Sequence, residues 1–304
     1  MFFKNLIVYR LTRDLEIFSD FEKLEQLLEE FSLKPCGSQD VKKFGWVPAF
    51  NGSDVKVMPS SSNFFIRARV TEKLLPPAII KEYSEDRFAS FEMREGRPPK
   101  KSEKLTIKDE VILELLPRAF TRSKDTCVAY LADMGFLLVG ATSEKAASDV
   151  TALLRKSIGS LPIVPLMPAK SIPLVMTESL KAGSLNSSNL TFGDSASFAA
   201  ADEPDNKANF KNQDLSSDEI DVMLANNKLV VKANLDWSDA INFDLDDDFY
   251  IRRINYSEDL KDQNDDIDRD DTAQRFDADL ALVLGEFSRL LPDLLSLFGG
   301  VDEG

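Results

Sequence analysis

The sequence predicts an α+β protein of mixed strands and helices with a protruding helical arm. Three observations support this fold class. Strand and helix patterns alternate over the first 75 residues, and they return after residue 118. The intervening stretch is highly charged and interrupted by prolines, which is more typical of an arm than of a core element. A length of 304 residues also favours about two domains.

These patterns suggest three parts. Residues 1–76 and 117–167 are expected to form a central α+β domain, residues 77–116 a helical arm, and residues 168–304 an acidic C-terminal α+β domain. In the central part, residues 3–11 predict a strand and residues 64–70 a second one. Between them, residues 19–31 predict a helix that opens with a Ser-Asp cap and carries one apolar face, formed by Phe21, Leu24, Leu27, Leu28 and Phe31.

The arm is expected to begin at Pro76 and Pro77, because a proline pair disfavours continuation of regular structure. Residues 78–97 then predict a charged helix, and residues 106–116 predict another. The RPPKKSEK segment between them predicts a basic tip broken by prolines.

After the arm, residues 126–141 predict a hairpin that turns at 133–135, and residues 143–159 predict a capped amphipathic helix. The proline-rich residues 161–173 suggest a crossing between domains. Residues 183–213 are rich in Ser, Asn, Ala and Asp with little apolar periodicity, so they predict a long mobile loop.

The C-terminal part ends with strands and one long helix. Residues 228–237 and 241–256 predict strands with an acidic turn. A helix is expected from about Asp271 until Pro292 ends or kinks it. Its apolar stripe is typical of core or dimer packing and consists of Phe276, Leu280, Val283, Phe287 and Leu291.

Charge is distributed very unevenly along the chain. The formal net charge is -15, yet residues 1–200 carry 27 Lys and Arg against 25 Asp and Glu, whereas residues 201–304 carry 10 against 27. Within residues 94–108 six basic side chains face only two acidic ones. Such a protein can be acidic overall and still present a basic face to a polyanion.

The absence of histidine excludes several classes of site. No Ser-His-Asp or Cys-His arrangement, no HExxH motif and no Cys2His2 zinc site can be built, and no phosphate-binding glycine motif occurs. Cys36 and Cys127 lack CxxC spacing, so two reduced thiols are expected. No apolar run approaches the roughly 20 residues that span a bilayer, and we expect a cytoplasmic protein without cofactor or metal.

Two alternative functions remain open from the residues alone. A carboxylate metal nuclease would use the acidic run at 262–271, with ligands from Asp265, Asp266, Asp268 and Asp270. That run lacks the turn glycine of a calcium loop, so a solvated acidic approach to the following helix is the favoured interpretation. Alternatively, the acidic C-terminal part could dock a basic protein partner as a scaffold.

Five sequence blocks indicate a protein family, which composition alone does not. These blocks, spread in order over nearly the whole chain, resemble the RdgC family of bacterial recombination-associated proteins: FKNLIVYRLTR (3–13), KPCGSQDVKKFGWVP (34–48), KDEVILELLPRAFTR (108–122), LLRKSIGSLPIVPL (153–166) and DQNDDIDRDDTAQRFDADLAL (262–282). The resemblance implies a non-enzymatic, nucleoid-associated, ring-shaped homodimer. Such a ring would encircle double-stranded DNA, also bind single-stranded DNA, show little sequence preference and restrain the RecA recombinase by occupying its substrate.

Candidate DNA-binding residues follow from grouped cations and from the resemblance. They are Lys4, Arg10, Arg13, Arg67, Arg69, Arg97, Lys100, Lys101, Arg118, Arg122, Lys211 and Gln213. Arg67 and Arg69 alternate along a strand and share a face, which favours an anion opposite them. Lys211 and Gln213 keep the chemistry of a basic family segment, although Asn212 stands where the family carries another lysine.

Phe120 lies between two of these arginines, after a proline that ends the preceding helix. One interpretation is that it folds back and packs under the arm. The other is a self-complementary contact that closes the dimer, since isolated aromatic anchors are typical of interface hot spots.

Overall fold

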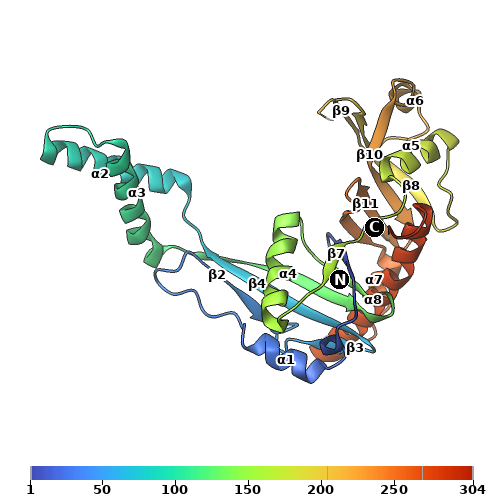
Figure 1. Cartoon of the computed structure of the whole chain (residues 1–304), viewed down its shortest axis with the longest axis horizontal. Coiled ribbons are helices and arrows are strands. Elements are labelled where there is room, and N and C mark those ends of the chain that lie inside the picture. The colour runs from blue at the N-terminus through green and yellow to red at the C-terminus, as the bar shows by residue number, and fades with distance from the viewer. Residues whose placement is uncertain (1, 204, 269, 303–304) are drawn as a thin grey trace. The chain divides into compact units, whose positions relative to one another are not determined.

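The chain folds into a mixed α+β structure with two antiparallel sheets (Figure 1). The computed structural model describes residues 2–203, 205–268 and 270–302. The chain divides into two compact units. Unit 1 comprises residues 1–28, 48–67 and 126–304, and unit 2 comprises residues 29–47 and 68–125.

The first sheet has the strand order β2-β4-β5-β6-β1-β7, with β3 paired to β4. Strands β4 and β5 begin in one unit and continue into the other. The bounds of its strands are β1 (Ile7–Leu11), β2 (Lys42–Val47), β3 (Met58–Ser60), β4 (Asn63–Lys73), β5 (Thr121–Leu131), β6 (Phe136–Val139) and β7 (Ile163–Pro165). The hairpin expected at 126–141 is confirmed, because β5 and β6 pair from Val128↔Val139 to Leu131↔Phe136.

The second sheet lies within unit 1 and has the order β12-β11-β10-β8-β9. Its strands are β8 (Leu190–Ala200), β9 (Lys207–Phe210), β10 (Lys228–Trp237), β11 (Ile241–Asp246) and β12 (Ile251–Tyr256). Each neighbouring pair is antiparallel. The strands and acidic turn expected within residues 228–237 and 241–256 are therefore confirmed, as β10, β11 and β12.

The chain also forms helices and short 3-10 turns. The helices and short 3-10 turns are η1 (Glu16–Phe18), α1 (Phe21–Glu29), α2 (Pro77–Glu95), α3 (Lys101–Leu115), η2 (Leu116–Arg118), η3 (Ala132–Met134), α4 (Glu144–Ile158), α5 (Ile172–Ala182), α6 (Asp218–Ala225), α7 (Glu258–Asp262) and α8 (Thr272–Leu297). Helices α2 and α3, with their connection, form what we call the arm. Among the described residues, none of the helices combines the length and apolar composition required to cross a membrane.

The core of unit 1 confirms the apolar stripe of the last helix. Leu280, Val283, Phe287 and Leu291 of α8 are fully buried, and Phe276 stacks on Phe50 with ring centroids 4.7 Å apart. Phe3, which precedes β1, makes an edge contact with Phe287 at 5.8 Å. The N-terminal segment and the last helix thus share one apolar cluster.

The prediction of a long mobile loop at 183–213 is wrong, because that segment contains β8 and β9. Strand β8 pairs with β10 from Leu190↔Trp237 to Ala200↔Lys228, and Phe198 is fully buried. Its many small and polar residues have low strand propensity and hide the alternation. Pairing on β10 and burial of a few apolar side chains outweigh that local preference.

Two helix boundaries also differ from expectation. Helix α3 begins at Lys101 rather than near residue 106, so part of the basic tip is helical. Pro292 does not end α8, which continues to Leu297. A proline inside a helix costs about 3 kcal/mol, but Leu290, Leu291 and Leu294 are fully buried beside it. Burying three leucines contributes more than that cost.

Candidate nucleic-acid interface

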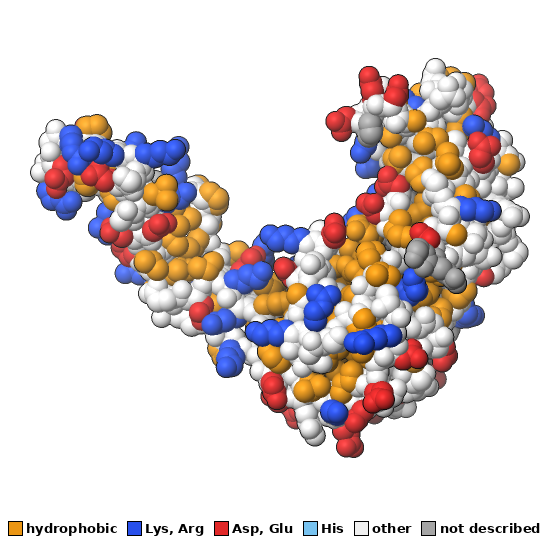
Figure 2. Space-filling view, viewed as in Figure 1, with side chains coloured by type: hydrophobic (Ala, Val, Ile, Leu, Met, Phe, Trp, Pro, Cys, Tyr) orange, Lys and Arg blue, Asp and Glu red, His pale blue; other side chains and the backbone are white. Residues whose placement is uncertain are grey.

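The arm carries the densest group of basic side chains expected from the sequence. Figure 2 shows Lys and Arg side chains gathered over α2 and α3 toward the end of the arm. Helix α2 ends at Glu95, the following Gly96 caps it in a left-handed conformation (φ 67°) that glycine tolerates, and α3 starts after Lys100. The short connection therefore holds the cations of 94–108 at the two adjacent helix ends.

Several of these arm cations are already oriented by neighbours. Arg97 donates to both carboxylate oxygens of Glu103 at 2.8 Å, and Glu103 also accepts from the Lys100 backbone N–H at 2.7 Å. The Arg97 guanidinium and the backbone hydrogen bond lower the pKa of Glu103 to about 2. Arg97 also lies over the Phe91 ring, 5.4 Å from its centroid. This arrangement fixes the turn while Lys100 and Lys101 remain exposed.

Three arginines of β4 and β5, which are Arg67, Arg69 and Arg122, have internal anionic or carbonyl partners. In unit 2, Arg69 of β4 pairs with Asp125 of β5 at 2.5 and 2.8 Å, and Arg122 pairs with Glu72 across the same strands. The hydrogen bonds that Arg69 donates to Asp125 raise the pKa of Arg69. In unit 1, Arg67 donates from Nε to the Pro48 carbonyl oxygen at 2.9 Å. The anion expected opposite Arg69 is thus supplied by the chain itself.

Phe120 lies immediately before β5, and 85% of its surface is exposed. Its backbone carbonyl accepts from the Leu74 N–H at 2.7 Å, which anchors the main chain while leaving the ring in solvent. It therefore does not pack under the arm within one chain. Arg118, at the end of η2, and Arg122 flank it and are exposed as well.

The remaining expected residues lie in unit 1 and do not form one group. Arg10 is in β1, Lys4 precedes that strand, and Arg13 follows it with a guanidinium nitrogen 3.3 Å from Ser160 Oγ. Gln213 donates from Nε2 to Ser217 Oγ at 3.1 Å and to Glu219 at 3.3 Å, so its amide stabilises the approach to α6.

Lys211 lines a polar groove of about 370 Å³ on the second sheet, together with Lys232, Asn234 and Arg253. Sequence analysis missed these last three. The one available signal was alternation, which places Lys232 and Asn234 on the same face of one strand.

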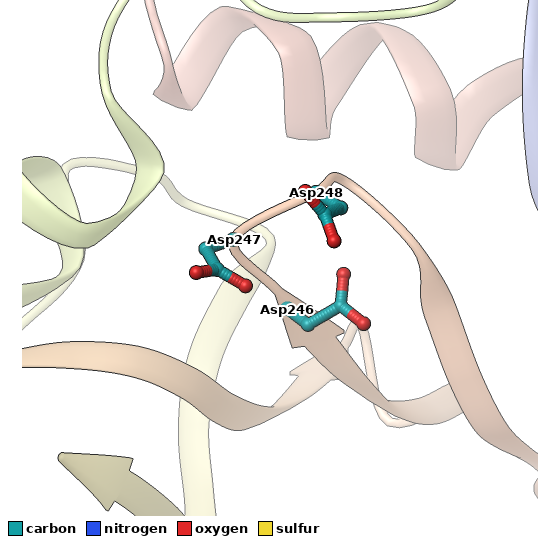
Figure 3. Close-up of side chains that lie close together, drawn as sticks. All are labelled: Asp246, Asp247 and Asp248. Atoms are coloured by element: carbon teal, nitrogen blue, oxygen red, sulfur yellow. The ribbon is translucent and has the colours of Figure 1, made fainter. Parts of the chain in front are cut away.

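The carboxylates proposed for a metal nuclease do not gather as expected. Within the described ranges, the one group of three acidic side chains close enough to share an ion is Asp246, Asp247 and Asp248 at the turn after β11, not the 262–271 run (Figure 3). In that run Asp265 pairs with Arg275 at 2.5 Å, and Asp268 accepts from the Asp270 N–H at 3.0 Å. Residue 269 lies outside the described residues.

The acidic turn is itself engaged in structural contacts. Asp246 accepts from Arg252 Nε at 2.6 Å and from the Tyr250 N–H at 2.9 Å. Burial, with smaller effects from Asp248 and Asp246, raises the pKa of Asp247. These contacts account for the turn as a structural feature of the β11–β12 hairpin.

Known proteins of one family are similar to this chain over nearly its whole length. The family model described as "Putative exonuclease, RdgC" matches residues 1–301. A protein of Psychromonas ingrahamii named "Recombination-associated protein RdgC" is 42% identical over 301 residues, covering 99% of both chains. Proteins of Salmonella typhimurium and Salmonella newport with the same name are also 42% identical over 301 residues, covering 99% of this chain and 98% of theirs. Full-length similarity at this identity leaves no part of the fold outside the match, and the chain belongs to the RdgC family.

Proposed function

We propose that this protein is a non-enzymatic DNA-binding protein that acts in recombination. It binds double-stranded and single-stranded DNA with little sequence preference. As a ring-shaped homodimer it encircles duplex DNA, and it restrains RecA by occupying the DNA that RecA needs. Family membership supports the connection to recombination, because the similar proteins carry that word in their names.

The observation that carries the DNA-binding proposal is the charge at the tip of the arm, residues 94–108. Residues 94–108 hold six basic side chains against Glu95 and Glu103 in a chain whose net charge is -15. Lysine and arginine bind phosphates without reading base edges, and affinity comes largely from the counterions that DNA releases. Binding of this kind tolerates any sequence and weakens steeply with salt.

The dimer proposal is supported by Phe120. A phenyl ring that is 85% exposed stabilises nothing within one chain, whereas aromatic residues commonly anchor protein interfaces. Unit 2 also contains an apolar groove of about 440 Å³ between α2 and α3, lined in part by Ile80, Phe88 and Ile112. In a two-fold contact the ring of each subunit would enter the groove of the other.

Restraint of RecA follows physically from competition for one substrate. A protein that covers phosphates without sequence preference lowers the free DNA available to any other DNA-binding protein. We therefore expect RecA-dependent strand exchange to fall as this protein is added, and to recover when additional DNA is supplied. Inhibition that persists at any DNA excess would indicate direct contact with RecA instead. Association with the nucleoid is part of the same proposal.

The test is fluorescence anisotropy with unrelated duplex and single-stranded oligonucleotides across a salt series. The slope of log affinity on log salt is expected to fall by about 0.9 for each phosphate contact removed from duplex DNA. The variant Lys100→Ala/Lys101→Ala should lower that slope, whereas Lys181→Ala, which removes a lysine paired with Glu178 on α5, should not. Absence of binding at low salt would contradict the proposal.

The nuclease alternative is tested in the same samples. Labelled linear DNA incubated with protein and Mg²⁺ is expected to remain intact, because the aspartates of 262–271 do not converge on one point. Degradation that disappears in Asp265→Asn/Asp268→Asn would instead establish an exonuclease.

A further inference from the structure

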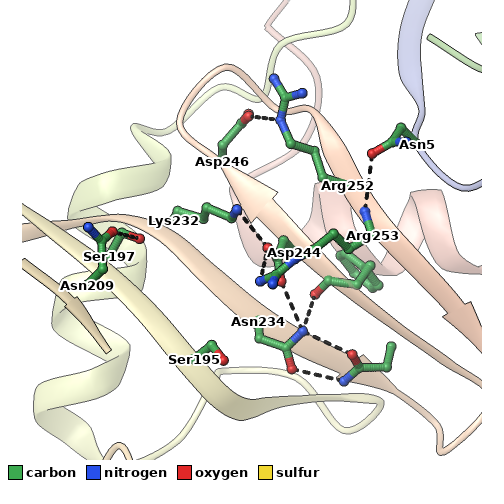
Figure 4. Close-up of polar contacts among 12 residues, drawn as sticks. Asn5, Ser195, Ser197, Asn209, Lys232, Asn234, Asp244, Asp246, Arg252 and Arg253 are labelled. Atoms are coloured by element: carbon green, nitrogen blue, oxygen red, sulfur yellow. Dashed lines mark hydrogen bonds and ion pairs between the residues drawn. The ribbon is translucent and has the colours of Figure 1, made fainter. Parts of the chain in front are cut away.

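The second sheet of unit 1 carries a polar groove whose construction is unusual for an exposed sheet face (Figure 4). The groove has a volume of about 370 Å³ and is lined from β8, β9, β10, β11 and β12. Its charged members are Lys211, Lys232, Arg253 and Asp244. The groove thus contains three cations and one carboxylate.

Asp244 is the anchor of this group. Its side chain is only 1% exposed, and it accepts from Lys232 Nζ at 2.7 Å and from Arg253 Nε at 2.6 Å. One buried carboxylate therefore holds two cations, and this group of three side chains has a net positive charge. Lys211, which is exposed at the same groove, adds to it. This excess of positive charge gives the groove a potential that attracts anions.

An amide network fixes the position of Asp244. Asn234 Nδ2 lies 3.1 Å from Asp244 Oδ1, and Asn234 and Asn242 exchange reciprocal side-chain hydrogen bonds of 2.9 and 3.0 Å. Gly193 leaves the space for this network, because a Cβ at that position would lie 1.9 Å from Asn234 Oδ1. The orientation of the carboxylate is thus set by residues of three strands.

Arg253 reaches Asp244 through a strained backbone. Its φ of 51° lies in the left-handed region that residues other than glycine seldom adopt, and the β11–β12 register shifts between Asn242 and Asp244. Its backbone N–H donates to Asn5 Oδ1 at 3.3 Å. Strain of this kind persists where the surroundings hold the residue firmly, and it is common at binding sites.

Arg253 and Lys232 each have N–H donors that remain available to a ligand. The side chain of Arg253 is 55% exposed and that of Lys232 is 33% exposed, so each presents N–H groups to solvent beyond those directed at Asp244. Asn209 lies on β9 at the same groove, and its Oδ1 accepts from the Ser197 hydroxyl of β8 at 2.7 Å, which leaves the Asn209 NH2 group as a further donor. Ammonium, guanidinium and amide N–H groups together match the oxygens of a phosphate.

We propose that this groove is a phosphate-binding site formed by Lys211, Lys232 and Arg253 and positioned by Asp244. Its ligand is a phosphate group, either of the DNA backbone or of a free phosphate. The assignment to DNA rests on the proposed function, whereas the phosphate chemistry does not. The site belongs to unit 1 and is therefore distinct from the cations of the arm.

Isothermal titration calorimetry of the full-length protein with inorganic phosphate tests the chemistry, and DNA anisotropy tests the source. Lys211→Gln and Arg253→Gln are the test variants. Lys211 lies outside the Asp244 network, and Arg253→Gln leaves Lys232 on the buried carboxylate, so both should fold. Lys228→Gln is the matched control, because Lys228 lies on β10 like Lys232 but donates to Asn206 at 2.8 Å outside the groove.

If the phosphate belongs to DNA, both test variants weaken DNA binding severalfold and lower the duplex salt slope by about 0.9, while the control does neither. A second outcome is that inorganic phosphate binds to the wild type but not to the variants, while the DNA affinity of the variants is unchanged. That outcome confirms the site with a free phosphate as its ligand. A wild type that binds no phosphate, with DNA affinity unchanged in both variants, overturns the site. If the wild type binds no DNA at low salt, the proposed function fails while the phosphate titration still decides the site.

Discussion

At the scale of single residues, Gly193 and Gly285 show how the same substitution acts oppositely in two environments. A Cβ at Gly193 meets Asn234 Oδ1 at 1.9 Å, whereas a Cβ at Gly285, within α8, meets nothing within 4 Å. We expect Gly193→Ala to destabilise the fold by about 1–3 kcal/mol through overpacking. Gly285→Ala should stabilise it by about 0.5–1 kcal/mol through helix propensity. Urea denaturation of both variants measures this, and a destabilised Gly285→Ala would contradict the helix environment.

Asp247 predicts a pH dependence with a definite sign. Burial raises its pKa above the ordinary 3.8, so the folded state binds the proton more tightly than the unfolded state. Its charged form therefore destabilises the fold at neutral pH, and this penalty disappears as pH falls through the raised pKa and below 3.8. Asp247→Asn should raise the melting temperature at pH 7, with a gain that shrinks toward pH 4.

Asp214 provides the opposite case for comparison. Hydrogen bonds from the Ser216 hydroxyl and N–H lower its pKa, so Asp214→Asn should lower the melting temperature at pH 7. The decrease in melting temperature caused by Asp214→Asn should become smaller as pH falls below 3.8. Equal shifts of the same sign in both variants would show that the two carboxylates do not differ as described.

At the scale of elements, the tip of the arm couples helix stability to cation availability. Glu103 caps the start of α3 and holds Arg97, and its pKa of about 2 means that this contribution is complete above 4.5 and is lost as pH falls toward 2. Glu103→Gln should speed amide exchange at the first turn of α3. It should also tighten DNA binding, because it releases the Arg97 guanidinium.

The control for this variant is Glu114→Gln, which makes the same charge change on the same arm by releasing Arg87 from a 2.6 Å ion pair. A larger gain in affinity for Glu103→Gln than for Glu114→Gln, measured by anisotropy at one salt concentration, indicates that Arg97 contacts DNA. Equal gains would reflect charge alone and would remove Arg97 from the interface.

The elements also show what local sequence can and cannot predict. The amphipathic helices and the 126–141 hairpin follow from periodicity, since burial on one face imposes the pattern. Strand β8 does not, because its stability comes from pairing with a strand about 40 residues later in the chain. The groove around Asp244 was missed for the same reason. Its charges come from three strands, and only their register brings them together.

At the scale of the whole molecule, the proposed ring makes a topological prediction. Two subunits that close around one axis need two separate contacts, and Phe120 supplies one of them in our proposal. On circular duplex DNA, the bound ring should survive a high-salt wash, because salt weakens phosphate contacts but does not open a closed protein ring. Linearising the circle should release the protein, since a ring can slide off an end.

Phe120→Ala tests whether that exposed ring closes the dimer. Removing an interface anchor costs roughly 2 kcal/mol or more, which is about a thirtyfold loss at that contact. The variant should therefore leave circular DNA in the wash while it still binds short oligonucleotides at low salt through the arm cations. Met93→Ala, which truncates an apolar side chain of α2 that is 80% exposed, should be retained like the wild type. If the wild type leaves circles as quickly as it leaves linear DNA, encirclement is wrong. Retention of Phe120→Ala beside a retained wild type would instead move the closing contact elsewhere.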